Sequence, residues 1–171
     1  MNRGITRIGS SISVVFKSKI HGGDFQTNAR VGLVRNATQS LANNTLTEII
    51  WDQVLYEAGA DLWTPGNPSW LVPIPFGSWL VVGFLEFAAG TTGEREAWVR
   101  VRDQANALVD NIGKASIPTL GGATPSLVNF SCLSFNNNGN NHFTIEGKHL
   151  QGVALNINHA RVHMIQLSRW D

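Results

Sequence analysis

From Arg30 onward, hydrophobic residues alternate with polar ones in short runs that clusters of Gly, Pro, Asn and Thr separate. A period of two is typical of β-strands with one buried face, and the clusters supply turn-forming residues. The pattern predicts strands at residues 31–34, 46–51, 70–74, 78–87, 96–102, 127–135, 142–145, 152–157 and 160–167, with a loop or irregular strand at 103–110. We therefore expect an all-β chain that folds as a two-sheet jelly-roll sandwich.

The composition indicates one globular domain with few charges. The chain has 171 residues, of which 43% are hydrophobic, and this is enough for one core. Charged residues make up 15%, whereas about 25% is usual, so much of the surface must be uncharged or lie in contacts. The formal net charge of +1 argues against a nucleic-acid partner.

Cys132 is the only cysteine, which excludes an intrachain disulfide framework and a multi-cysteine zinc site and suits assembly in a reducing cytoplasm. The longest apolar run, at residues 79–84, has the length of a strand and is too short to cross a membrane. Near the N-terminus, Ser13 interrupts a short apolar run, and no pattern typical of signal-peptide cleavage follows. We therefore expect neither export nor a membrane partner.

Residues 1–27 are predicted to form an extended basic arm, and residues 28–171 the jelly-roll domain. The first twenty residues carry four basic and no acidic side chains, whereas the rest carry nine basic and twelve acidic ones. The arm lacks the period of an amphipathic helix. Two interpretations remain open, a leader without a fixed partner or an arm that docks on one. In the second case the anchoring residues would be Arg3, Arg7, Ile12, Phe16, Lys17 and Lys19.

No catalytic motif stands out, because the sequence contains no nucleophile elbow, phosphate-binding loop or dinucleotide-binding fingerprint. His159 and His163 would share one face of a strand and could meet at a three-fold axis as metal ligands, but no acid or cysteine completes the set. Glu94 and Glu96 could form a carboxylate pair for acid–base chemistry, although a solvated hairpin end is the favoured interpretation. We expect no enzymatic activity, no cofactor and no metal.

Six tryptophans accompany a single tyrosine. Four of them lie in predicted strands and are expected in the core: Trp51, Trp70, Trp79 and Trp98. Trp63 lies in a polar loop and is the candidate for an exposed contact, either packing on a partner protein or stacking on a sugar. We favour the protein partner, because one loop tryptophan is weak evidence for sugar binding.

Several segments occur in the order found in a known family. Residues 39–52 contain an Asn-Thr-x-Thr sequence followed by Trp51 and Asp52, residues 72–81 carry Ile74 and Trp79 at the apolar and aromatic positions of a Pro-x-x-Gly-x-Tyr motif, and residues 160–167 form an apolar last strand. Together, residues 28–169 resemble the trimeric jelly-roll domain shared by complement C1q and tumour necrosis factor, which also occurs in bacterial and phage proteins. The resemblance implies this fold and a homotrimer, and no reaction. Because residues 152–155 lack the acid of the family's Gly-Asp-x-Val segment, calcium ligands are not carried over.

Two kinds of virion protein fit these expectations. The first is a phage capsid decoration or cement protein, in which the arm anchors the homotrimer to the major capsid protein. The second is a receptor-binding module at a tail-fibre tip that recognises a host surface glycan or protein. A fibre tip needs a shaft or an attachment domain, which an arm of this length does not supply, so we favour the decoration protein. Its expected location is the virion, after assembly in the host cytoplasm.

Overall fold

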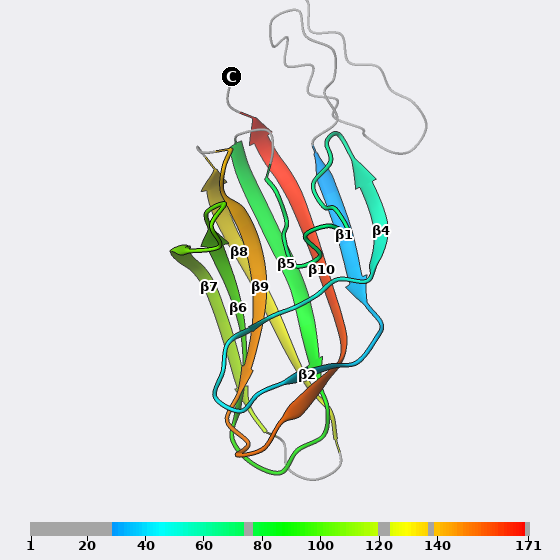
Figure 1. Cartoon of the computed structure of the whole chain (residues 1–171), viewed down its shortest axis with the longest axis vertical. Coiled ribbons are helices and arrows are strands. Elements are labelled where there is room, and N and C mark those ends of the chain that lie inside the picture. The colour runs from blue at the N-terminus through cyan, green and yellow to red at the C-terminus, as the bar shows by residue number, and fades with distance from the viewer. Residues whose placement is uncertain (1–28, 74–76, 120–123, 137–138, 170–171) are drawn as a thin grey trace, which may run out of the picture.

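The computed structural model describes residues 29–73, 77–119, 124–136 and 139–169, in which strands are the only regular elements. Ten strands follow one another along the chain (Figure 1): β1 (Arg30–Arg35), β2 (Gln39–Leu41), β3 (Thr47–Glu48), β4 (Gln53–Ala58), β5 (Gly77–Phe87), β6 (Glu94–Arg102), β7 (Leu108–Pro118), β8 (Ser126–Asn136), β9 (His142–His149) and β10 (Leu155–Arg169). The all-β prediction is confirmed. Among the described residues, no helix long and apolar enough to cross a membrane is present.

The strands form two antiparallel sheets that pack face to face (Figure 1). The first sheet has the order β4-β1-β10-β5-β8, and β2 pairs with the beginning of β10. The second sheet has the order β3-β9-β6-β7. The last strand, β10, lies between β1 and β5 and so joins segments that are far apart in the sequence. This arrangement confirms the two-sheet jelly roll.

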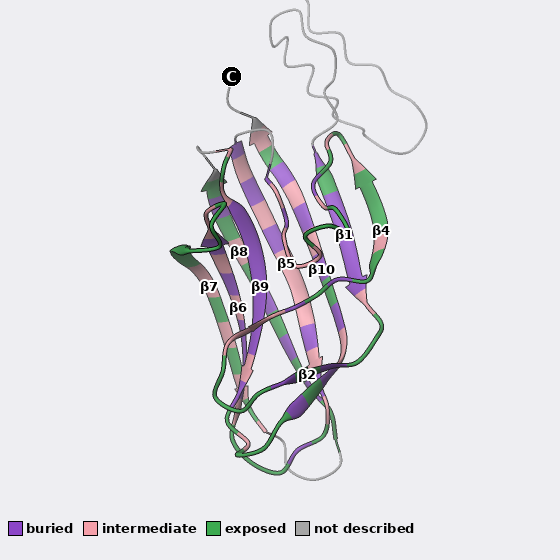
Figure 2. Ribbon diagram, in the orientation of Figure 1, coloured by how far each residue is buried: buried purple, intermediate pink, exposed green. Residues whose placement is uncertain are grey.

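The period of two reflects which side of each strand faces the other sheet. In β5, four alternate residues are fully buried: Trp79, Val81, Leu85 and Phe87. In β10, Val162 and Met164 are buried in the same way. Figure 2 shows the resulting bands of buried and less buried residues along both strands. Each of these strands therefore supplies one face to the core and directs its other face away from the second sheet.

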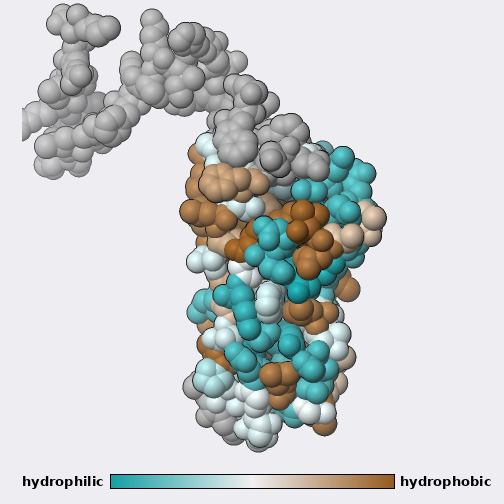
Figure 3. Space-filling view, turned by 90° about the vertical axis from the view of Figure 1, so that its left-hand side faces the viewer, coloured by the Kyte–Doolittle hydropathy of each residue, from teal (hydrophilic) through white to brown (hydrophobic). Residues whose placement is uncertain are grey.

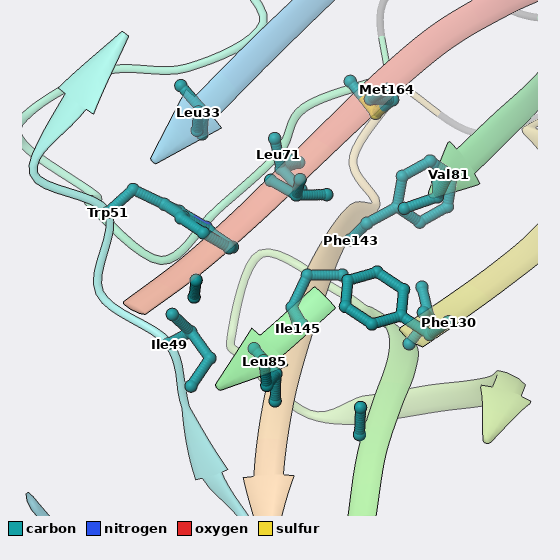
Figure 4. Close-up of a cluster of buried hydrophobic side chains, with 14 of the residues drawn as sticks. Leu33, Ile49, Trp51, Leu71, Val81, Leu85, Phe130, Phe143, Ile145 and Met164 are labelled. Atoms are coloured by element: carbon teal, nitrogen blue, oxygen red, sulfur yellow. The ribbon is translucent and has the colours of Figure 1, made fainter. Parts of the chain in front are cut away.

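The core lies between the two sheets, and Trp51 and Trp79 are fully buried in it. Figure 4 shows Phe143 and Ile145 of β9 among core side chains of the first sheet. The expectation that Trp70 and Trp98 also belong to the core is wrong, because both are only half-buried. Trp98 projects from the outer side of β6, where it contacts Glu96, and Trp70 lies in a loop.

Several strand boundaries differ from the prediction. The alternation does not predict β2, β4 or β7, and the strand expected at residues 46–51 is reduced to β3. Residues 70–73 form no strand, since Leu71 makes only a single bridge to Phe143. The strands expected at residues 152–157 and 160–167 are one strand, β10. A loop does follow β6, where the carboxylate of Asp103 accepts hydrogen bonds from the backbone N–H groups of Ala105 and Ala107 before β7 begins.

Candidate interaction surface

The outer face of the first sheet carries hydrophobic side chains at the protein surface. They alternate with the buried residues of three strands, and we call them the apolar face: Leu80, Val82 and Phe84 of β5, Leu127, Leu133 and Phe135 of β8, and Ile165 and Leu167 of β10. The register places Leu80 between Leu133 and Ile165, so aliphatic side chains from three strands lie side by side. Leu133 and Phe135 are 61% and 68% exposed. A contiguous apolar area is typical of a surface that contacts another protein.

The edge formed by β7 and β8 extends this area. Leu108 and Val109 of β7 are also exposed large hydrophobic residues. Figure 3 views this edge and shows a group of hydrophobic side chains in its upper part, beside hydrophilic ones. Exposed apolar side chains therefore continue from the first sheet onto the neighbouring edge of the second.

A tyrosine and a histidine form a defined contact at one border of the apolar face. Tyr56 of β4 and His163 of β10 are both paired with Gly32 of β1, and their rings stack with centroids 5.6 Å apart and planes inclined by 18°. The Tyr56 hydroxyl oxygen lies 2.8 Å from Nδ1 of His163. A Cβ atom at Gly32 would stand 2.7 Å from the Tyr56 ring, so this contact requires glycine beneath it.

The protonation state of His163 follows from its surroundings. Burial, and in addition the positive charge of Arg161, lower the pKa of His163. The neutral ring is therefore favoured, and in its Nε2–H tautomer Nδ1 accepts a hydrogen bond from the Tyr56 hydroxyl. The pair fixes the orientation of both rings at the border of a surface that is lined mainly by hydrophobic side chains.

The outer face of the second sheet is organised differently, because its charges are paired. The buried carboxylate of Glu146 in β9 forms ion pairs with Arg100 and Arg102 of β6. Arg102 also lies 3.5 Å from the Glu48 carboxylate of β3. Charges that are satisfied within the protomer leave little to gain from a partner. We therefore place the candidate interaction surface on the first sheet.

Glu96 corrects the interpretation of Glu94 and Glu96 as a solvated hairpin end. Glu96 is 4% exposed, and its carboxylate accepts hydrogen bonds from the Lys114 ammonium, at 2.8 Å, and from the Trp98 indole. Burial alone would raise the pKa of Glu96, but these hydrogen bonds and the charges of Lys114 and Lys148 hold it below its usual value. The carboxylate is thus the centre of a structural ion-pair cluster.

The residues predicted to contact partners are the arm residues and Trp63, and the structure describes only Trp63. Arg3, Arg7, Ile12, Phe16, Lys17 and Lys19 lie outside the described residues, so their role stays a prediction. Trp63 is half-buried and packs against the core, and its indole N–H donates to the carbonyl of Pro68. Its internal contacts leave only part of the ring for an external partner, and such a contact also stays a prediction.

The two histidines of β10 lie on the outer side of the first sheet, as the spacing predicts. His159 packs against Phe84, with ring centroids 5.4 Å apart, whereas His163 contacts Tyr56. Across the described ranges, no group of three or more His, Cys, Asp or Glu side chains is placed to hold a metal ion. Within one protomer, these histidines therefore act as hydrogen-bonding and packing residues.

The alternation of Cys132 with Phe130 and Ser134 in the sequence predicts a buried side chain. In the structure Cys132 is only half-buried, because it lies on the edge strand β8. Its side chain packs against the core beside Gly113 of β7. Burial raises the pKa of the Cys132 thiol to about 11. The thiol is therefore expected to behave as a small, protonated hydrophobic group.

Labelling of the native protein with a bulky maleimide at pH 7.5 is expected to be at least about tenfold slower than labelling of the urea-unfolded chain. The raised pKa of Cys132 reduces the reactive thiolate fraction, and packing restricts access of the reagent. Reaction rates measured by mass spectrometry test this expectation. Native labelling as fast as that of the unfolded chain would contradict it.

Sequence reasoning misses Tyr56 because it predicts no strand at β4. This strand lies at the edge of the first sheet, and most of its residues are exposed, so it has no clear alternation. The available signal is a short run of strand-forming residues, Val54, Leu55 and Tyr56, three residues before a glycine. The pairing of Tyr56 with His163, which lies 107 residues further along, depends on strand order and cannot be read from local sequence.

Solved structures with the same fold include members of the tumour necrosis factor family. Murine APRIL matches with a TM-score of 0.63 and 14% identity over 82% of this chain and all of its own. The Eiger TNF of S. frugiperda matches with a TM-score of 0.56 and 9% identity over 85% of this chain and 94% of its own. The domain thus has a C1q/TNF-like jelly-roll fold, as the sequence resemblance implies.

A viral structural protein has this fold as well. The vertex protein P5 of PRD1 matches with a TM-score of 0.55 and 15% identity over 86% of this chain and all of its own. No protein-family model matches the sequence, and no curated protein is significantly similar to it. At these levels of identity, the likeness defines the fold and carries no activity or partner with it.

Proposed function

We propose that the chain is a phage capsid decoration or cement protein that acts as a homotrimer. The observation that carries this proposal is the apolar face, which leaves side chains such as Leu133 exposed on a domain that pairs charges on its other sheet. Association of three copies through this face would remove apolar surface from water, and each Å² buried would stabilise the trimer by about 25 cal/mol. The sequence resemblance to a trimeric domain and the fold shared with a PRD1 vertex protein support the proposal.

The arm would connect each protomer to the shell. The described chain begins at Ala29, whose carbonyl accepts a hydrogen bond from the N–H of Gln166 near the end of β10. Residues 1–28 therefore join the domain at the end where β10 finishes (Figure 1). In a three-fold symmetric trimer, three arms would leave the same end of the assembly. That end would face the major capsid protein.

In the proposed mechanism, the protein stabilises the shell by binding to it and catalyses no reaction. Four basic residues of the arm would pair with acidic groups on the shell, and its apolar residues would occupy hydrophobic sites there. Each trimer would then link neighbouring shell subunits and add contact area that must be broken before the shell expands. Decoration would thus raise the resistance of the particle to heat or pressure.

Deletion of residues 1–20 is expected to leave a folded trimer that no longer decorates particles. The first strand begins at Arg30, so the deletion removes no described part of the domain. Purified full-length and truncated proteins would be added to particles that lack the protein, and binding would be measured by co-sedimentation. If the truncated trimer binds as tightly as the full chain, the docking surface lies on the jelly roll instead.

The salt dependence of binding to particles can distinguish the contribution of the basic residues of the arm from that of its apolar residues. Replacing its four basic residues by glutamine should weaken binding and remove most of its salt dependence, because charge pairs are screened over about 8 Å at physiological ionic strength. The matched Ile12→Ser and Phe16→Ser variant should weaken binding while the salt dependence remains. Binding that is unaffected by both sets of substitutions would contradict the anchoring role of the arm.

A receptor-binding module is the second candidate function. The loop between β9 and β10 lies at the end opposite the arm and exposes Leu150 and Val153, which are 40% and 63% accessible. This end would be free to contact a host surface. Binding of the isolated trimer to host cells, with loss of binding after Val153→Asp, would favour this function, and binding to particles but not to cells would exclude it.

A further inference from the structure

The contact between Tyr56 and His163 lies where the proposed trimer would bury it. His163 is half-buried in a single protomer and is paired with Val82 of the apolar face on one side and with Gly32 on the other. Tyr56 covers one face of its ring and is itself 38% exposed. A neighbouring copy seated on the apolar face would therefore remove most of the remaining water around the imidazole.

We propose that His163 makes assembly of the homotrimer dependent on pH, so that the neutral imidazole permits association and the imidazolium opposes it. This inference rests on the proposed trimer and adds a means of control to the same interface. Histidine suits this role because its charge changes between about pH 5 and 8. Such a trimer would hold the shell more tightly at neutral pH than after mild acidification.

The charges around His163 favour this direction. Arg161 lies two residues away on β10, and Arg30 of β1 is paired with Ile165 at the next outward position. On β4, Tyr56 is the neighbouring titratable group, and on β5 the nearest acid, Glu86, is paired with His159 at the other end of the face. The outward residues of β8 are uncharged: Leu127, Asn129, Ser131, Leu133 and Phe135. A protonated His163 would therefore add a third positive charge beside Arg161 and Arg30, and none of these strands places a carboxylate next to it to compensate.

The sign of the effect follows from linkage. Burial already lowers the pKa of His163 in the protomer, and further burial by a neighbouring copy would lower it more, because the charged form loses hydration. The trimer would then bind fewer protons than three free protomers, so its association constant must fall with falling pH. If each of three sites is lowered by one further pKa unit, the association constant falls by about 1,000-fold across the titration.

Sedimentation of the full chain between pH 8 and pH 5.5 would test the inference, with far-UV circular dichroism to confirm that the fold is retained. We expect the apparent dissociation constant of the wild-type trimer to rise at least about fivefold over this range, which is part of the full effect, because the lowered pKa of His163 leaves its titration incomplete at pH 5.5. His163→Gln can still accept the Tyr56 hydrogen bond but cannot become charged, and it should remain a trimer with little pH dependence. The matched control His159→Gln lies at the other end of the same face, beside the Glu86 carboxylate and away from Arg30, so it should keep the wild-type response.

The outcomes distinguish this inference from the proposed function. A wild-type chain that is monomeric at pH 8 overturns the trimer and the switch together. A trimer with the same dissociation constant at both pH values overturns only the switch. A pH response that survives His163→Gln, or that disappears with His159→Gln, also overturns the assignment to His163.

Discussion

Replacing Leu133 by aspartate is expected to convert the trimer into a folded monomer. Leu133 is 61% exposed in one protomer, so the isolated domain tolerates a polar side chain at this position. The assembled trimer, in contrast, would bury three carboxylates that have no partner. A buried unpaired charge costs about 3 kcal/mol or more, and about 1.4 kcal/mol corresponds to a tenfold change in an equilibrium constant. The expected loss of association free energy is therefore large enough to abolish the trimer at micromolar protein concentration.

Val153→Asp provides a matched control for this substitution. Val153 is 63% exposed, nearly the same as Leu133, but it lies in the loop between β9 and β10 and outside the apolar face. Light scattering should give three times the chain mass of 18.7 kDa for the wild type and the control, and a single chain mass for Leu133→Asp. If Leu133→Asp remains trimeric, the subunits associate through another surface.

The central strands could be predicted from the sequence because they have a side facing the core along most of their length. The run at residues 78–87 matches β5 almost residue for residue, and its alternate residues fill the space between the sheets. The edge strands could not be predicted in the same way. In β7, the register shifts twice against β6, which breaks the period of two, and its first four residues are all exposed.

An apolar run does not by itself define a strand. The apolar run at residues 70–74 predicts a strand. In the structure, Leu71 is buried in the core and makes only a single bridge to Phe143, and Trp70 stacks on His142. The side chains of Leu71 and, in part, Trp70 are removed from water because the loop that carries them packs on β9 of the second sheet. Periodicity reports burial, and only backbone pairing, which depends on distant segments, decides whether the buried segment is a strand.

The interaction surface was only partly visible in the sequence. In β5, residues such as Leu80 and Val82 are apolar on the side that faces away from the core, which gives a nearly continuous apolar run instead of strict alternation. Such a run is typical of a strand covered on both faces. It could therefore indicate that β5 has a partner on its outer side, but the neighbours of Leu80, which are Leu133 and Ile165, required the register of the sheet.

Acidification from pH 7.5 to pH 4 is expected to lower the free energy of unfolding by about 3 kcal/mol through His142. His142 is 2% exposed, and its ring stacks on Trp70 with centroids 3.8 Å apart. Its Nε2 has no hydrogen-bond partner within the described part of the chain. Burial lowers the pKa of His142 to about 4, and Arg102 contributes in the same direction, although the carboxylates of Glu48 and Asp103 oppose this decrease.

The sign follows from the order in which the two states take up the proton. The unfolded chain is protonated as the pH falls through about 6.5, whereas native His142 stays neutral until the pH nears 4. Its contribution to stability is therefore complete above pH 6.5 and is lost between pH 6.5 and 4. His142→Phe keeps a ring against Trp70 but cannot bind a proton, so urea unfolding at one protein concentration should show a shallower dependence of stability on pH for this variant. The control His159→Gln, which removes a half-buried histidine, should keep the wild-type slope. Equal slopes for the wild type and His142→Phe would mean that the native protein accommodates the charged ring.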